Sequence, residues 1–166
     1  MKITLIAAIG KNNELGSNNQ LLWHIPEDFK WFKSKTMGKT MLMGRNTMDS
    51  LGKPLKNREN WVLTRDFNRL IDGFQGFSNW EEVKHKASEL NLEELMIIGG
   101  AEIYKQSIQF ADELIITHVH KEFPQADVFF PEIDSAIWKE VETINQSETS
   151  ENNWEYKFNT YIRSIV

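Results

Sequence analysis

The stretch LLWHIPEDFKWF, residues 21–32, places an ionisable side chain among large apolar ones. Pro26 is a residue type that commonly opens a helix, so Glu27 and Asp28 fall in a first helical turn. Asp28 then shares a helical face with Trp31 and Phe32, three and four residues further on. An ionised carboxylate rarely lies among apolar groups without a partner. We therefore expect Asp28 to have a polar partner, whose identity these residues alone leave open. The alternative, a carboxylate that only complements the helix dipole, suits Glu27 better.

Two junctions of the type strand–glycine–helix are candidate phosphate sites. MGRNT (residues 43–47) and IIGGAEIY (residues 97–104) each place glycine between an apolar run and a helical pattern. A helix start offers free backbone N–H groups to an anion, and Arg45 adds a charge to the first junction. There, Asn46 or Thr47 is expected to cap the helix. Each junction alone is more typical of an ordinary capped helix, but two in one small domain indicate a ligand with at least two phosphates.

Other chemical motifs are incomplete or absent. MGKT (residues 37–40) lacks the earlier glycine of a phosphate-binding loop, because that position holds Lys33. The chain has no cysteine, which excludes disulfides, thiol nucleophiles and Cys-ligated metals. His118 and His120 place two imidazoles on one strand face, as a metal pair would. No further ligand has a matching spacing, so a solvated strand face is the favoured interpretation.

The elements that position these residues follow an α/β pattern. Short apolar runs predict strands at 3–9, 40–43, 61–63, 95–98 and 114–117, and 3.6-residue patterns predict helices at 27–36, 80–90 and 101–110. This alternation is typical of a mostly parallel sheet with helices on both faces. Near the C-terminus, Trp154, Tyr156 and Phe158 alternate with polar residues, as in a half-buried antiparallel strand. A polar loop, residues 10–19, follows the first strand, where ligands often bind, and an ordinary surface loop is an equal alternative.

Composition narrows the class of protein. The 166 residues, 40% of them hydrophobic, suit a single domain spanning residues 1–166. A net charge of -5 argues against binding to duplex nucleic acid. The first apolar run is too short to cross a membrane and lacks a signal-peptide pattern. We expect a cytoplasmic protein that binds a small molecule, with no membrane or nucleic-acid partner and no metal.

Seven segments in order resemble the dihydrofolate reductase family, in its bacterial chromosomal type. They are IAAIGKNNELG, the pattern W-x-x-P-x-D-x-x-x-F from Trp23 to Phe32, MGRNTMDSLGKPLKNR, LTR, IIGGAEIY, LIITHV and ADVFFP. The resemblance spans the chain and implies an eight-stranded, mostly parallel sheet with an antiparallel C-terminal strand and four helices. It implies transfer of a hydride from NADPH to 7,8-dihydrofolate, giving tetrahydrofolate for one-carbon metabolism. A monomer that binds antifolate inhibitors is the corresponding expectation.

The resemblance also implies roles for individual residues. The catalytic group comprises Asp28, Trp23 and Leu21. The substrate group comprises Ile6, Asp28, Phe32, Leu51, Leu55, Arg58, Ile98, Tyr104 and Thr117, with Arg58 on the glutamate tail. The NADPH group comprises Ala8, Leu15, Gly16, Asn19, Gly44, Arg45, Asn46, Thr47, Leu63, Thr64, Arg65, Gly99, Gly100, Ala101, Glu102, Ile103 and Tyr104.

The sequence departs from the family pattern at two positions. Many members have proline where this chain has Leu22, immediately before Trp23. Some bacterial members have arginine where this chain has Glu102, so Arg65 is the expected source of NADPH preference. Two alternatives stay open: a pyrimidine reductase of riboflavin synthesis with the same architecture, and a non-catalytic nucleotide-binding module. Arg58 and the segment around Asp28 favour the folate enzyme.

Overall fold

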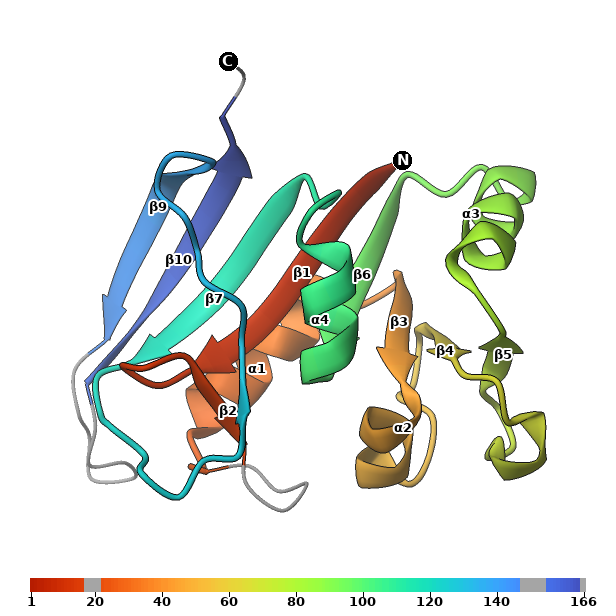
Figure 1. Cartoon of the computed structure of the whole chain (residues 1–166), viewed down its shortest axis with the longest axis horizontal. Helices are drawn as coiled ribbons and strands as arrows, with labels where there is room; N and C mark the ends of the chain where they lie inside the picture. Colours follow the sequence, from red (N-terminus) through yellow and green to blue (C-terminus); the bar gives the residue numbers. More distant parts are fainter. Residues whose placement is uncertain (17–21, 147–154, 165–166) are drawn as a thin grey trace.

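An eight-stranded sheet forms the centre of the protein, whose computed structural model describes residues 1–16, 22–146 and 155–164 (Figure 1). The strands lie in the order β5-β4-β3-β6-β1-β7-β10-β9. β10 runs antiparallel to both of its neighbours, and the other pairings are parallel. This confirms the predicted single-domain α/β fold. The strands of the sheet are β1 (Lys2–Ile9), β3 (Thr40–Gly44), β4 (Glu59–Leu63), β5 (Gln75–Phe77), β6 (Glu94–Gly99), β7 (Glu113–Val119), β9 (Trp138–Gln146) and β10 (Tyr156–Arg163).

Four α-helices cover the sheet, two on each face. One core cluster packs α3 (Trp80–Glu89) and α4 (Ala101–Ser107) against the sheet, and a second packs α1 (Pro26–Thr36) and α2 (Arg45–Leu51). Figure 1 shows α4 in front of the sheet and α1 behind it. A 3₁₀ turn, η1 (Phe67–Arg69), and a two-stranded sheet of β2 (Glu14–Gly16) and β8 (Val128–Phe129) complete the described elements. No described helix is long and apolar enough to span a membrane.

Local sequence explains where the helices begin and end. α1 starts at Pro26, with Glu27 and Asp28 in its first turn, and MGKT forms the turn that leads into β3. α4 ends at Ser107 rather than at the predicted residue 110, because the amide of Phe110 bonds the carbonyl of Ser107 in a tighter turn. The predicted cap of α2 is wrong: the helix already begins at Arg45, after Gly44, without a side-chain cap.

A polar cluster lies where a solvated strand face was predicted. His118 Nε2 lies 2.8 Å from Tyr161 Oη, and Asn159 Nδ2 donates to the same oxygen at 3.1 Å. Asn159 is fully buried, and burial lowers the pKa of His118 to about 4. The prediction holds only in part: His120 is exposed, whereas His118 is half-buried beside Tyr161 of β10. No group of three or more candidate metal ligands occurs among the described residues.

Candidate active site

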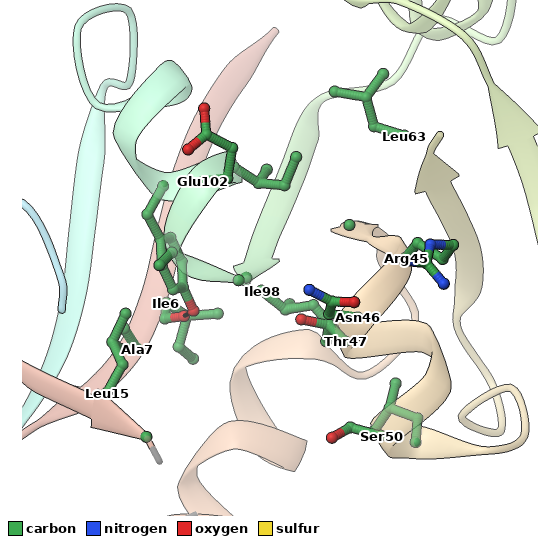
Figure 2. A pocket seen from close by; sticks show the side chains of 18 of the residues that line it. Ile6, Ala7, Leu15, Arg45, Asn46, Thr47, Ser50, Leu63, Ile98 and Glu102 are labelled. Carbon is green, nitrogen blue, oxygen red and sulfur yellow. Dashed lines mark hydrogen bonds between the residues drawn. The ribbon is translucent and has the colours of Figure 1, made fainter. Parts of the chain in front are cut away.

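A large cleft opens at the carboxyl ends of the parallel strands, with a volume of ≈ 1510 Å³. Residues at the ends of β1, β3, β4, β6 and β7 line it, which is where α/β sheets bind ligands. Figure 2 shows Ile6, Ala7 and Leu15 on one side, facing Asn46, Thr47 and Ser50 of α2. Predicted site residues that line the cleft are Ile6, Ala8, Leu15, Gly16, Asp28, Phe32, Gly44, Arg45, Asn46, Thr47, Leu51, Leu55, Arg58, Leu63, Thr64, Arg65, Ile98, Gly99, Gly100, Ala101, Glu102, Ile103, Tyr104 and Thr117.

Asp28 projects from the first turn of α1 into the apolar part of this cleft. Its Oδ1 accepts a 2.7 Å hydrogen bond from the hydroxyl of Thr117 on β7. Burial raises the pKa of Asp28 to about 6, and the Thr117 hydrogen bond opposes this rise. The described residues offer Asp28 no ion-pair partner, so its charge is only partly compensated. Such a carboxylate suits a ligand that donates two hydrogen bonds to it.

Removing this charge is expected to stabilise the free protein at pH 7. The unfolded carboxyl titrates near 3.8 and the folded one near 6, so folding disfavours the ionised form. The penalty is absent below the unfolded pKa, where both states are protonated, and complete above the folded pKa. Asp28→Asn should therefore raise the free energy of unfolding at pH 7 by about 1–3 kcal/mol. Urea titrations should show the gain shrinking as the pH falls from 6 to below 4, whereas a loss of stability at pH 7 would contradict the burial argument.

The wall around Asp28 is apolar but contains one buried donor without a described partner. Trp31, one helical turn after Asp28, stacks on Phe158 with ring centroids 4.3 Å apart. Its indole N–H is buried and has no hydrogen-bond partner among the described residues. Phe32 and Leu51 belong to the same core cluster and also line the cleft. A flat heterocycle with its own polar edge fits this combination of apolar walls and buried polar groups.

The opposite part of the cleft brings together the two predicted helix starts. The first residues of α2 and α4 line it, and neither helix has a side-chain cap. A Cβ at Gly44 would lie 3.0 Å from Ile103 Cγ1, and Cβ atoms at Gly99 and Gly100 would each lie 3.4 Å from Thr47 Oγ1. Gly99 also has a φ of 126°, which favours glycine. The glycines therefore keep the space between the two helix starts open, which fits the pyrophosphate of a dinucleotide.

Two arginines on this side differ in their surroundings. Arg45 pairs with Asp49 of the same helix at 3.4 Å. Arg65 follows β4 and lines the cleft, and none of the ion pairs between described residues includes it. Thr64 lies beside it, its hydroxyl oxygen accepting a hydrogen bond from the amide of Asp66. Arg65 is thus the more available guanidinium for an anionic ligand group.

Arg58 also lines the cleft, and the structure shows neighbours that hold its side chain and that the sequence did not predict. Its Nη1 donates to the hydroxyl oxygen of Thr36 at 3.1 Å, and its Nε donates to the carbonyl of Lys56 at 2.9 Å. Thr36 is fully buried and donates in turn to the carbonyl of Phe32. Partial burial lowers the pKa of Arg58 from its ordinary value. The guanidinium is oriented before any ligand binds, which favours recognition of a carboxylate.

Tyr104 joins the two parts of the cleft. Its hydroxyl donates a 2.6 Å hydrogen bond to the carbonyl of Ile6, and its ring packs 4.9 Å from that of Phe130. Burial, together with the negative charge of Asp28, raises the pKa of Tyr104 well above its ordinary value. Tyr104 is therefore a fixed neutral donor that sets the position of β1 beside α4.

Three predicted site residues are not among the described residues that line the cleft. The side chain of Trp23 packs against Phe123, with ring centroids 5.0 Å apart, and is not among the cleft-lining residues. Leu21 and Asn19 lie outside the residues that the structure describes. The catalytic role given to Trp23 and Leu21 stays a prediction.

The cleft also contains residues that sequence reasoning missed. Phe29 and Lys33 extend the lining along α1, and Trp80 and Gln106 form part of it on α3 and α4. The indole N–H of Trp80 donates to Gln106 Oε1 at 2.8 Å. Ser78, Asn79 and Trp80 follow β5, so the rule about strand carboxyl ends was the signal that could have found them. The remaining unpredicted lining residues are Ala7, Trp31, Ser50 and Val128.

An α/β sheet whose cleft places two glycine-bounded helix starts beside a buried carboxylate is typical of an enzyme that acts on a small molecule with a nucleotide cofactor. The family model for dihydrofolate reductase matches residues 2–163. The chain is 40% identical over 164 residues to the dihydrofolate reductase of Neisseria meningitidis serogroup A, which covers 98% of this chain and 99% of that protein. It is 36% identical over 159 residues to that of Bacillus subtilis, covering 96% and 93%. The chain belongs to the dihydrofolate reductase family.

A solved structure agrees with the sequence comparisons. Dihydrofolate reductase from Enterococcus faecalis, complexed with NADP(H) and RAB-propyl, matches with a TM-score of 0.90 and 32% identity. The match covers 99% of this chain and 97% of that one. Together these similarities favour the folate enzyme over the pyrimidine reductase and the non-catalytic module.

Proposed function

We propose that the cleft carries out the reaction of its family, the NADPH-dependent reduction of 7,8-dihydrofolate to 5,6,7,8-tetrahydrofolate. The observation that carries this proposal is the buried carboxylate of Asp28, bonded to Thr117 at the apolar end of a cleft whose other end contains two glycine-bounded helix starts. The reaction needs a flat polar ring and a dinucleotide side by side, and the cleft has surfaces of both kinds.

Asp28 binds and polarises the substrate. A pterin ring presents a ring N–H and an adjacent amino group, two donors with the spacing of one carboxylate. Thr117 orients that carboxylate by donating to Oδ1. The negative charge of Asp28 favours a protonated ring, which assists proton addition at N5. Because the carboxylate binds the edge of the ring remote from N5, we assign the proton transfer itself to a water molecule.

The cofactor fits the glycine-bounded part of the cleft. We propose that residues 99–104 and 44–47 hold its pyrophosphate, that Thr64 and Arg65 bind the 2′-phosphate, and that Ala8, Leu15 and Gly16 lie beside the nicotinamide. Bound NADPH supplies the hydride. The apolar residues Ile6, Ile98 and Leu15 restrict water on the nicotinamide side, which protects the reacting atoms.

Arg58 is proposed to bind the α-carboxylate of the glutamate tail. Because this contact lies far from the reacting atoms, Arg58→Leu should raise KM for dihydrofolate about 10- to 150-fold, the worth of a charge-assisted contact of about 1.5–3 kcal/mol. KM for a pterin without the glutamate tail should stay unchanged. Lys53→Leu, a cation five positions earlier in the sequence that is not among the cleft-lining residues, is the matched control. Equal losses for both substrates would assign Arg58 a structural role.

The direct test of the proposed function is an assay with purified protein, NADPH and dihydrofolate. Loss of the nicotinamide absorbance that depends on both protein and dihydrofolate supports it. No loss with dihydrofolate, or equal loss with a pyrimidine substrate of riboflavin synthesis, would overturn it. We further propose that the protein works as a cytoplasmic monomer, without nucleic acid, and that it binds antifolate diaminopyrimidines through Asp28.

A further inference from the structure

Glu14 is a buried acid that has no part in the reaction described above. Only 2% of its surface is exposed, and none of the described ion pairs includes it. Its carboxylate instead accepts two short hydrogen bonds from backbone amides. Oε1 accepts from Asn12 at 2.5 Å, and Oε2 accepts from Phe123 at 2.6 Å. The carboxylate therefore bridges two segments that lie 109 positions apart in the sequence.

Backbone hydrogen bonds also join the two segments on either side of the Glu14 contact. The segment of residues 10–16 bonds to residues 121–130 through the pairs Lys11–Lys121, Gly16–Asp127 and Asn13–Phe130. β2 and β8 pair at the same place. Asn13 Nδ2 also donates to the carbonyls of Phe130 and Pro131, at 3.4 and 3.3 Å. Among these described side-chain contacts, the carboxylate of Glu14 is the one that carries a negative charge: one oxygen accepts from Phe123 across the two segments, and the other accepts from Asn12 and orients the carboxylate within its own segment.

The position of the Glu14 carboxylate leaves no room for a side chain at residue 10, which is glycine. A Cβ at Gly10 would lie 2.6 Å from Glu14 Oε1 and 2.8 Å from the ring of Phe123. Both distances are too short for real contacts, so a side chain at residue 10 would displace the bridge. Gly10 and Glu14 therefore form one structural unit with Phe123.

This unit borders the cleft on the nicotinamide side. Leu15 and Gly16, the next residues after Glu14, line the cleft, as does Val128 of β8. Figure 2 shows Leu15 beside Ala7 and Ile6, on the side opposite α2. Phe123, on the other side of the bridge, packs against Trp23. A shift of Glu14 would therefore reach both the cleft wall and the segment that contains Trp23.

We infer that Glu14 is a positioning residue for the cofactor: its carboxylate joins residues 10–16 to residues 121–130 and thereby holds Leu15 and Gly16 against the nicotinamide. The inference rests on the proposed function. Glu14 acts through the backbone of its own segment and does not contact the ligand. The adenosine end of NADPH is bound by other residues, around Arg65. Its binding therefore does not depend on Glu14.

The main test uses Glu14→Gln, which has the same shape but only one acceptor oxygen. The side-chain NH₂ of glutamine must then face the backbone N–H of either Asn12 or Phe123. One of the two hydrogen bonds is therefore lost. NADPH affinity, measured by quenching of protein fluorescence, should fall about tenfold, which equals about 1.4 kcal/mol. A fragment without the nicotinamide, 2′-phospho-ADP-ribose, should bind the variant and the wild type equally.

Two further variants and one control test whether the loss of NADPH affinity comes from the displaced carboxylate. Gly10→Ala should reproduce the selective loss of NADPH affinity, because its Cβ displaces the same carboxylate. Glu14→Asp keeps both acceptors and should bind NADPH more tightly than Glu14→Gln. Glu94→Gln is the matched control, since Glu94 is also a shielded acid, bonded to Thr4 and paired with Lys39, but lies away from the cleft. It should leave both affinities unchanged, whatever it does to stability.

Amide hydrogen exchange separates this inference from the proposed function, because it needs no ligand. In free Glu14→Gln, the amides of Asp127 and Phe130, which bond the carbonyls of Gly16 and Asn13, should exchange faster than in the wild type. Unchanged exchange would overturn the inference even if the wild type failed to bind NADPH. Unchanged NADPH affinity in Glu14→Gln, or equal loss for NADPH and 2′-phospho-ADP-ribose, would also overturn it.

Discussion

Asp28→Asn is expected to lower the rate of hydride transfer at pH 7 by about 10²–10⁴-fold, the usual range for lost acid–base assistance. Asparagine keeps the shape of the side chain and can still accept from Thr117 Oγ1, which lies 2.7 Å from Asp28 Oδ1. It lacks the negative charge that favours a protonated pterin. Each tenfold loss corresponds to about 1.4 kcal/mol of barrier.

The rate must be followed in a single turnover, because product release can limit steady-state turnover and hide the effect. NADPH affinity should be nearly unchanged, since the residues proposed to hold the cofactor lie on other elements. Glu27→Gln is the matched control: Glu27 is adjacent in α1, its carboxylate accepts from Tyr156 Oη at 3.4 Å, and it does not line the cleft. A wild-type rate in Asp28→Asn would remove Asp28 from the mechanism.

Arg65→Ala is expected to weaken NADPH binding by about 1.5–3 kcal/mol, or roughly 10- to 150-fold, the worth of a hydrogen bond to a charged group. Arg65 lines the cleft and is free of ion pairs with the described residues, whereas Arg45 already pairs with Asp49. NADH lacks the 2′-phosphate, so its affinity should barely change. Fluorescence titration of both cofactors gives the ratio directly.

Arg69→Ala is the control for Arg65→Ala. Arg69 lies four residues further along, pairs with Asp66 at 3.6 Å and does not line the cleft. Its removal should leave the ratio of NADPH to NADH affinity unchanged, which separates specific binding from a general loss of positive charge. Equal losses for both cofactors in Arg65→Ala would show that Arg65 does not recognise the 2′-phosphate.

The sequence predicted the architecture because its signals are local. Nearly continuous apolar runs such as residues 3–9 and 95–98 predicted inner parallel strands, and they are β1 and β6. Asp28 stood out because Trp31 and Phe32 share its helical face. The glycines at 44, 99 and 100 stood out because each follows a strand. In these cases the types and spacing of a few adjacent residues are enough to predict the element or the site.

What the sequence did not predict depends on contacts between distant segments. His118 was predicted on a solvated strand face, but Tyr161 of β10, 43 positions away, lies beside it and leaves it half-buried. Thr36 orients Arg58 across 22 positions, and Trp80 bonds Gln106 across 26. Glu14 belongs to the polar loop of residues 10–19, and its carboxylate bonds Phe123, 109 positions further along the chain. No local pattern specifies which strand edge or amide such a side chain meets.

The measurement that tests the account most directly is the pH dependence of single-turnover hydride transfer in Asp28→Asn relative to the wild type. We expect the deficit to shrink steadily as the pH is lowered, because the fraction of dihydrofolate already protonated in solution grows and replaces the help of the carboxylate. A deficit that stays constant across pH would contradict it, since Asp28 would then position the ring without favouring its protonation.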